Sequence, residues 1–268
     1  MNFFSPTSPG FYRPTGMHMT HNSPGVETVG VLGGLGPRAS AEFLKTIYEF
    51  SHHIREQDSP RVLMLSDPTY PDRTEVLLNG TADALLWRLA SDLKKFDELG
   101  VCSVVICCIT IHHLLPLLPE QLRSLVISLV DTALEGVIGE GRKQLLLCTN
   151  GTRRMGIFER NSLWPRAADL IVMPEPRDQE AIHDLIYRLK GNAGAGDLIH
   201  EVEALLPRYG VDSFIAGCTE IHLLIREAAR LRPVHQNWLY IDPLTILARS
   251  IAQGSWQSST SIQYASAD

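Results

Sequence analysis

The sequence predicts an α/β fold of two related halves, each built on a parallel sheet, with a ligand bound between them. Short runs rich in Val, Ile and Leu alternate with amphipathic stretches, a pattern typical of parallel strands joined by helical crossovers. One segment of this pattern also recurs at a constant offset of 110 residues. A chain with both features is expected to place its functional groups where its two halves meet.

The strand candidates are short apolar runs bounded by polar residues or glycine. Such runs suit strands that are buried on both faces of a parallel sheet. They are Thr28–Leu32, Val62–Leu65, Val101–Cys107, Gln144–Cys148, Leu170–Met173 and Ser213–Ala216.

Helices are predicted between these strands, and the sequence marks their ends. Pro37 suits the first turn of a helix that includes Ala39–Phe50. Thr81 is expected to cap a second helix that runs to Leu99 and stops at Gly100. Two further helices are predicted, over Gln179–Leu189 and Asp197–Tyr209.

The repeat aligns two segments that each read as a glycine turn, a buried strand, a cysteine at the end of the strand, and a helix. Chance similarity between apolar strands explains matching valines and isoleucines, but not glycine, cysteine and histidine together. The matched pairs are Gly100 with Gly210, Val101 with Val211, Ser103 with Ser213, Cys108 with Cys218, Ile111 with Ile221, His112 with His222 and Leu114 with Leu224.

Composition excludes several classes of protein. The 268 residues are 44% hydrophobic and 20% charged, which suits a globular enzyme with a sizeable core. Because the net charge is −6, no basic field is available for a nucleic-acid backbone, and no nucleic acid is expected as a partner. The longest apolar run, Val101–Leu118, is interrupted by His112, His113 and Pro116, so no membrane span is predicted.

The cysteines and the chain ends indicate a cytoplasmic protein. Five cysteines occur without a CxxC pair, and residues 1–25 resemble a flexible extension more than a secretion signal. Reduced thiols are therefore expected. Residues 254–268 are expected to form a mobile tail.

The two cysteines shared by the repeat are the first candidates for chemistry. Ligands of open parallel sheets bind beyond the carboxyl ends of the strands, where Cys108 and Cys218 are predicted to lie. A helix starting beside each thiol is expected to lower its pKa toward neutrality. Two such thiols facing one cleft could act as base and acid on opposite faces of a carbon. The other cysteines, Cys102, Cys107 and Cys148, are predicted to be core residues.

Two loops after strands could bind an anion. The glycine-rich turn Gly30–Pro37, which includes Gly34, lets bare backbone approach a ligand, but it lacks the GxGxxG spacing of a dinucleotide site. Thr149, Asn150 and Thr152 form a polar loop that could either hold a carboxylate or cap a helix.

Arg73 and the histidine pairs complete the candidates. Arg73 could fork a carboxylate or be an ordinary loop arginine in solvent. The pairs His52-His53 and His112-His113 lack metal-binding spacing, so no metal site is predicted.

Taken in order, the motifs resemble the aspartate/glutamate racemase superfamily, in particular its aspartate racemase branch. The resemblance spans roughly residues 28 to 250, and the combination of Gly-Cys-Thr-Glu, Pro-Asp-Arg-Thr and Gly-Gly-x-Gly-Pro is specific. The matching segments are Val29–Pro37, Pro71–Thr74, Cys108–His112, Leu147–Thr152, Leu189–Gly191 and Ala216–Ile221.

This resemblance implies two pseudosymmetric, doubly wound α/β domains with the active site in the cleft between them. We expect domains over residues 26–135 and 136–235, with 236–253 returning to the first. It also implies a small carboxylate or amino acid as substrate, no pyridoxal phosphate or other cofactor, and a homodimer.

The resemblance also implies roles for individual residues. Cys108 and Cys218 match the two catalytic cysteines. Glu220 would lie behind the second cysteine, near the substrate amino group. The residues that would hold carboxylates are Arg73 and Lys190, and those that would anchor the α-carboxylate or amino group are Thr110, Thr149, Thr152 and Thr219.

One position departs from the family pattern. Where the family reads Cys-Asn-Thr, this chain has Ile109. The change removes one or two hydrogen bonds of about 0.5–1.5 kcal/mol each, which suggests a less polar substrate. Three functions therefore remain open: a two-cysteine racemase or epimerase, a diacid isomerase or decarboxylase using the same cysteines, and a ligand-binding homologue with weak activity.

Overall fold

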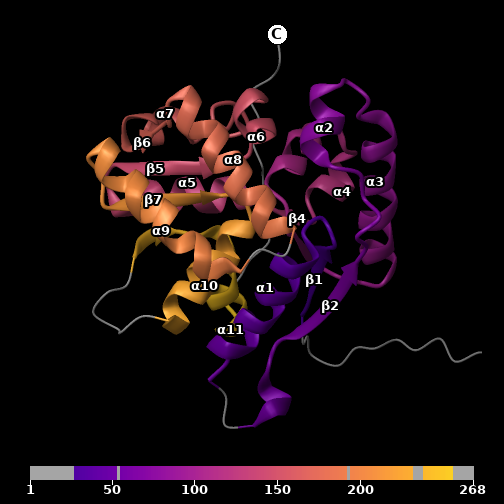
Figure 1. Cartoon of the computed structure of the whole chain (residues 1–268). Helices are drawn as coiled ribbons and strands as arrows, with labels where there is room; N and C mark the ends of the chain where they lie inside the picture. The colour runs from indigo at the N-terminus through magenta and orange to yellow at the C-terminus, as the bar shows by residue number, and fades with distance from the viewer. Residues whose placement is uncertain (1–26, 53–54, 192–193, 232–237, 256–268) are drawn as a thin grey trace, which may run out of the picture.

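The structure is a computed structural model that describes residues 27–52, 55–191, 194–231 and 238–255. The expected N-terminal extension, and all but the first two residues of the expected tail, lie outside these ranges. The described residues form two four-stranded parallel sheets, with strand orders β2-β1-β3-β4 and β6-β5-β7-β8 (Figure 1). The predicted two-part α/β fold is therefore confirmed.

The first half of the molecule carries the first sheet and the second half carries the second. The strands of the first sheet are β1 (Thr28–Gly33), β2 (Arg61–Ser66), β3 (Ser103–Ile106) and β4 (Val126–Ile127). Those of the second are β5 (Gln144–Cys148), β6 (Ile171–Val172), β7 (Ser213–Gly217) and β8 (Leu239–Ile241). Each predicted strand is present within a few residues of its expected limits. The sequence pattern missed β4 and β8, which are too short to show a periodicity.

Helices surround both sheets (Figure 1). In the first half these are α1 (Pro37–Phe50), η1 (Glu56–Asp58), α2 (Arg73–Leu78), α3 (Asp83–Glu98), η2 (Thr110–Leu117), α4 (Glu120–Arg123) and α5 (Leu129–Glu140). In the second half they are α6 (Asn150–Arg154), α7 (Trp164–Ala167), η3 (Ala168–Leu170), α8 (Pro176–Lys190), α9 (Ala195–Leu205), η4 (Leu206–Tyr209), α10 (Glu220–Leu231) and α11 (Pro243–Ala252). No described helix is long and apolar enough to cross a bilayer.

The predicted helix ends are partly right. Pro37 begins α1 as expected. Thr81 does not cap α3, because the N-cap residue is Ala82 and the Thr81 hydroxyl donates instead to the Val76 carbonyl at 3.5 Å. Gly80, with φ of +70°, ends the preceding helix at this point, so Thr81 belongs to the turn between two helices.

Two other helices differ from the expected type. The segment after Cys108 is the 3-10 helix η2, which contains Pro116. Proline removes a backbone donor and disfavours a regular α-helix. The helix predicted to reach Tyr209 leaves α geometry at Leu205 and continues as the 3-10 helix η4, whose second residue is Pro207.

The largest apolar cluster joins the two halves. It contains Val105 of the first sheet, Leu146 of the second and Leu244 of α11, all fully or almost fully buried. Helix α1 packs against both α10 and α11. Within the predicted C-terminal segment, β8 pairs with β7 in the second sheet, whereas α11 lies against α1 of the first half.

The two histidines of the repeat make equivalent contacts in the two halves. Nε2 of His112 accepts from the backbone N–H of Leu129 at 3.1 Å, at the start of α5. Nδ1 of His222 lies 2.6 Å from the carboxylate of Asp242, the N-cap of α11. Each histidine therefore binds the start of the helix that follows the edge strand of its own sheet. Burial lowers the pKa of His112 to about 4, so it is neutral at pH 7.

Candidate active site

A pocket of about 170 Å³ lies beyond the carboxyl ends of the strands and is lined by both halves. The first half supplies the glycine-rich turn after β1 and Arg73 at the start of α2. The second half supplies Lys190 at the end of α8 and Glu220 at the start of α10. Arg73, Lys190, Glu220 and the glycine-rich turn therefore meet at one pocket, and Cys218 contacts it through Glu220.

The two cysteines of the repeat occupy equivalent positions. Cys108 follows β3 and Cys218 follows β7, and they are 6% and 5% exposed. The Cys218 thiol donates a hydrogen bond to Oε2 of Glu220 at 2.8 Å. Cys218 is therefore a protonated thiol in the substrate-free protein.

The expected lowering of thiol pKa is wrong for Cys218. Burial raises its pKa well above the usual range, and the charge of Glu220 raises it further. The nearby Lys190 ammonium opposes this rise but does not cancel it. The free-energy cost of burying a thiolate at this position exceeds the stabilisation that the start of helix α10 could give it.

A cation lies near each thiol. Burial alone would lower the pKa of the Arg73 guanidinium, but the charges of Cys108 and Asp72 raise it. The pKa of Lys190 is raised in the same way, chiefly by Cys218 and Glu220, against the effect of its burial. Both side chains therefore stay charged in the pocket, and each can offset negative charge at the neighbouring sulfur.

Backbone carbonyls hold Arg73 in place and leave one donor free. The guanidinium donates to the carbonyl oxygen of Pro71 at 2.7 Å and to that of Leu35. Its Nε–H is buried and has no hydrogen-bond partner among the described residues. Arg73 is therefore not an ordinary loop arginine in solvent. It is the first residue of α2 and is only 7% exposed.

Glu220 supplies the complementary free acceptor. Its Oε2 receives the Cys218 thiol, while Oε1 is buried without a partner in the described part of the chain. The glycine turn runs directly over this oxygen, because a Cβ at Gly36 would lie 2.2 Å from Oε1. One unsatisfied donor and one unsatisfied acceptor thus line the same pocket, and buried polar groups of this kind normally have partners.

An acidic residue that the sequence reasoning did not assign holds Lys190. Asp72 of the first half lies 3.4 Å from Nζ of Lys190 and accepts from the Tyr187 hydroxyl at 2.8 Å. The ammonium also lies 4.1 Å from the centre of the Tyr187 ring. Asp72 is part of the Pro-Asp-Arg-Thr motif, where its side chain caps α2 by accepting from the N–H of Glu75. From the sequence, this capping role alone explains an aspartate at that position. Only the fold shows that it also bridges the halves.

Three of the predicted threonines form one cluster across the halves. The hydroxyl oxygen of Thr110 lies 3.3 Å from that of Thr149 and 2.9 Å from that of Thr152. Thr219 donates to the carbonyl oxygen of Cys107 at 3.2 Å. These hydroxyls tie the segments that follow β3, β5 and β7 to one another.

The remaining predicted residues lie in different surroundings. Gly34 has φ of +86° and lies against the backbone of Asp67, where a Cβ would come within 2.3 Å. The Asn150 side chain donates to Glu180 at 2.8 Å on α8. Ile109 is 1% exposed and belongs to the apolar cluster that joins the halves. Its part in substrate choice stays a prediction.

The other cysteines behave mostly as expected. Cys107 and Cys148 are fully buried, and burial raises the pKa of Cys148 to about 12. Cys102 is exposed and not part of the core, because it precedes β3 on the turn after Gly100. Cys107 and Cys148 also lie at strand ends, but both belong to the apolar cluster that joins the halves.

Replacing Glu220 with glutamine should lower the pKa of Cys218. The amide oxygen can still accept from the thiol, but it carries no charge to oppose a thiolate. Peptide-level mass spectrometry should show iodoacetamide labelling of Cys218 rising at lower pH than in the unmodified protein. Glu227→Gln, about two turns further along α10, is the matched control. An unchanged labelling profile in Glu220→Gln would contradict this electrostatic coupling.

Comparisons with known proteins agree with this fold. A family model described as Asp/Glu/Hydantoin racemase matches residues 32–251. An uncharacterised protein of Pectobacterium carotovorum subsp. carotovorum is 29% identical over 128 residues, which cover 47% of this chain and 81% of that protein.

Two solved structures share the fold. Aspartate racemase of Picrophilus torridus superposes with a TM-score of 0.71 at 23% identity, covering 85% of this chain and 94% of the other. An aspartate racemase homologue from Pyrococcus horikoshii OT3 gives a TM-score of 0.58 at 19% identity, covering 85% and 99% of the two chains.

Proposed function

The chain belongs to the Asp/Glu/hydantoin racemase family and is an isomerase of the racemase class, and from this premise we propose a specific reaction. The protein interconverts the enantiomers of an amino acid without a cofactor, and Cys108 and Cys218 act as its acid–base pair. The substrate is aspartate, glutamate or a less polar relative.

The observation that carries this proposal is the pair of unsatisfied groups in one pocket. The free Nε–H of Arg73 can donate to a carboxylate, and the free Oε1 of Glu220 can accept from an ammonium group. An amino acid offers both groups on one carbon. Lys190, held by Asp72, supplies a second cation that suits a side-chain carboxylate.

The proposed chemistry removes the proton from one face of the α-carbon and adds a proton to the opposite face. A cysteine thiolate removes the Cα proton and becomes a thiol, while the other thiol gives its proton to the opposite face and becomes a thiolate. In the substrate-free protein Cys218 is the thiol, which leaves Cys108 as the base for the substrate that binds this form. Because the Cα proton is very weakly acidic, the carbanion needs the charges of Arg73 and Lys190 close by.

Exchange in heavy water tests the proposal directly. The protein, without pyridoxal phosphate, is incubated with a panel of L- and D-amino acids. Loss of the Cα proton signal is followed by NMR and inversion by chiral chromatography. We expect exchange together with inversion for at least one acidic amino acid. A panel without any exchange would contradict the proposal.

The two alternatives give different results in the same setting. A diacid isomerase or decarboxylase would leave amino acids untouched and would convert an unsaturated or substituted diacid, with an adduct on Cys108 visible by intact mass if the thiol attacks carbon. A binding homologue would show ligand-dependent thermal stabilisation without exchange. The homodimer, the cytoplasmic location and the domain limits stay predictions from the sequence.

A further inference from the structure

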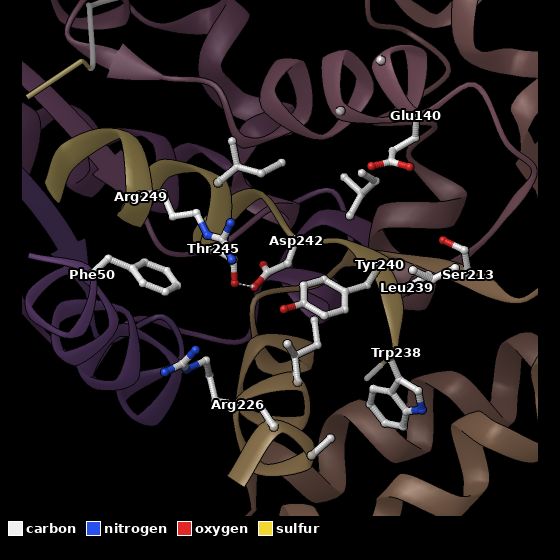
Figure 2. A pocket seen from close by; sticks show the side chains of 17 residues that line it. Phe50, Glu140, Ser213, Arg226, Trp238, Leu239, Tyr240, Asp242, Thr245 and Arg249 are labelled. Carbon is white, nitrogen blue, oxygen red and sulfur yellow. Dashed lines mark hydrogen bonds between the residues drawn. The ribbon is translucent and has the colours of Figure 1, made fainter. Parts of the chain in front are cut away.

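A second and larger cavity, of about 670 Å³, lies between α1, α5, α10, β8 and α11 (Figure 2). It shares no lining residue with the pocket that contains Arg73 and Glu220. Its volume falls within the range of small-molecule sites. The racemase chemistry proposed above makes no use of it.

One end of this cavity is basic and aromatic. Figure 2 shows the side chains of Phe50, Arg226, Tyr240 and Arg249 around a common space, with the Tyr240 hydroxyl directed into it. The guanidinium carbons of Arg249 and Arg226 lie 4.9 Å and 5.6 Å from the centre of the Phe50 ring. Two cations and a hydroxyl therefore converge on one position.

Arg249 is exposed, and its charge has no ion-pair partner within the described part of the chain. No carboxylate there lies within salt-bridge distance of it, whereas Arg226 pairs with Glu49. The Tyr240 hydroxyl likewise has no hydrogen-bond partner among the described residues. The Nε–H of Arg226 is buried without a hydrogen bond and lies 3.8 Å from Oε1 of Glu42, so Arg226 is paired with two carboxylates. Donors are thus in excess at this end.

The acidic residues of the cavity are already engaged. Asp242 accepts from His222 and Thr245, both at 2.6 Å, and from the backbone N–H of Leu244 at 3.1 Å. Glu140, at the other end in Figure 2, lies 3.4 Å from Arg142. Neither carboxylate is available to Arg249, so an anion from outside is the complementary group.

The rest of the cavity suits a flat apolar body. Helix α10 contributes the small side chains of Ala228 and Ala229, whereas Gly136 of α5 is covered by Ile241 and Ile246. The Tyr240 ring is fixed by stacking on Phe214, with ring centres 6.0 Å apart and planes 29° apart.

We propose that this cavity binds a small aromatic carboxylate. Its carboxylate contacts the Arg249 guanidinium and the Tyr240 hydroxyl, and its ring lies against the aromatic side chains and the alanines of α10. The inference rests on the cavity alone and holds whatever reaction the first pocket performs.

Calorimetric titration with matched probes tests the proposal. The probes are 1-naphthoate and its neutral analogue 1-naphthamide. We expect the naphthoate to bind with one-to-one stoichiometry and roughly tenfold more tightly than the amide, as a charge-assisted hydrogen bond implies. Arg249→Gln should weaken naphthoate binding about tenfold and leave the amide unaffected. Tyr240→Phe should weaken it a few-fold.

Arg230→Gln provides the matched control. This arginine lies one turn beyond Arg226 on α10, outside the cavity, and pairs with Glu42 and Glu227. Its loss should not change naphthoate binding. Melting curves verify that each variant is folded.

Four outcomes would overturn the proposal. They are no naphthoate binding by the unmodified protein, equal binding by Arg249→Gln, equal affinity for the naphthamide, and competition by saturating aspartate, which would place the probe in the first pocket. Inorganic phosphate is titrated as well. If it binds as tightly as the naphthoate, and equally through Arg249, the cavity is a simple anion site and the aromatic part of the proposal fails.

Discussion

Replacing either Cys108 or Cys218 with alanine is expected to reduce racemisation by at least 10²–10⁴-fold, the usual contribution of a general acid or base. Each reaction direction needs one cysteine to remove a proton and the other to return one. Alanine has no group that can do either. Both thiols are almost fully buried, so water has little access to replace them. Chiral chromatography of the reaction mixture measures the loss.

The two variants should also differ from each other in a specific way. With one cysteine left, a proton can still be removed from a single face and deuterium returned to that same face. Each variant should therefore exchange only one enantiomer, without inversion, and the two variants should select opposite enantiomers. Cys102→Ala, which changes an exposed cysteine just before β3, should behave as the unmodified protein does. Substantial inversion by either active-site variant would refute the two-base mechanism.

Asp242→Ala is expected to lower the free energy of unfolding by about 3–5 kcal/mol, because it removes a buried carboxylate that accepts three hydrogen bonds and leaves their donors without a partner. Asp242 is 2% exposed and stabilises two parts of the fold. It caps α11 and it accepts from the fully buried His222, which in turn bonds to Thr46 of α1 at 3.0 Å. Urea denaturation measures the loss. Asp212→Ala is the control, since the Asp212 side chain is 73% exposed.

The same residue gives a pH dependence with a definite sign. Burial alone would raise the pKa of Asp242, but His222 and the hydroxyl and amide donors lower it below its usual value. A carboxyl group whose pKa is lower in the folded state stabilises the fold above its unfolded pKa of roughly 3.9. That stability is lost as the pH falls through the folded pKa. The difference in unfolding free energy between the unmodified protein and Asp242→Ala should therefore shrink in acid and stay constant near neutral pH.

The sequence predicted those parts of the site that depend on local order along the chain. Cys108 and Cys218 were found because each ends a buried strand at the same place in a repeat. The fold confirms that repeat through the matching strand orders of the two sheets. Arg73 and Glu220 were found because they stand in motifs of contiguous residues.

The parts that depend on distance in space were not predictable. Asp72 and Lys190 are 118 residues apart, and no local pattern indicates that they meet. The direction of the pKa shift of Cys218 was predicted wrongly. The sequence shows the helix that follows the cysteine, but not how deeply the thiol is buried or that a carboxylate faces it. The second cavity was also not predictable, because elements from both halves of the chain form its walls.

The packing of α11 on α1 has a consequence for synthesis on the ribosome. The buried faces of the two helices, with Phe43 and Leu244 in the same cluster, lie at opposite ends of the described chain. About 190 residues separate the end of α1 at Phe50 from the start of α11 at Pro243. At a translation rate of about 5–20 residues per second, the nascent first half waits roughly 10–40 s before its covering helix exists. During that time the apolar face of α1 is open to chaperones and to neighbouring nascent chains.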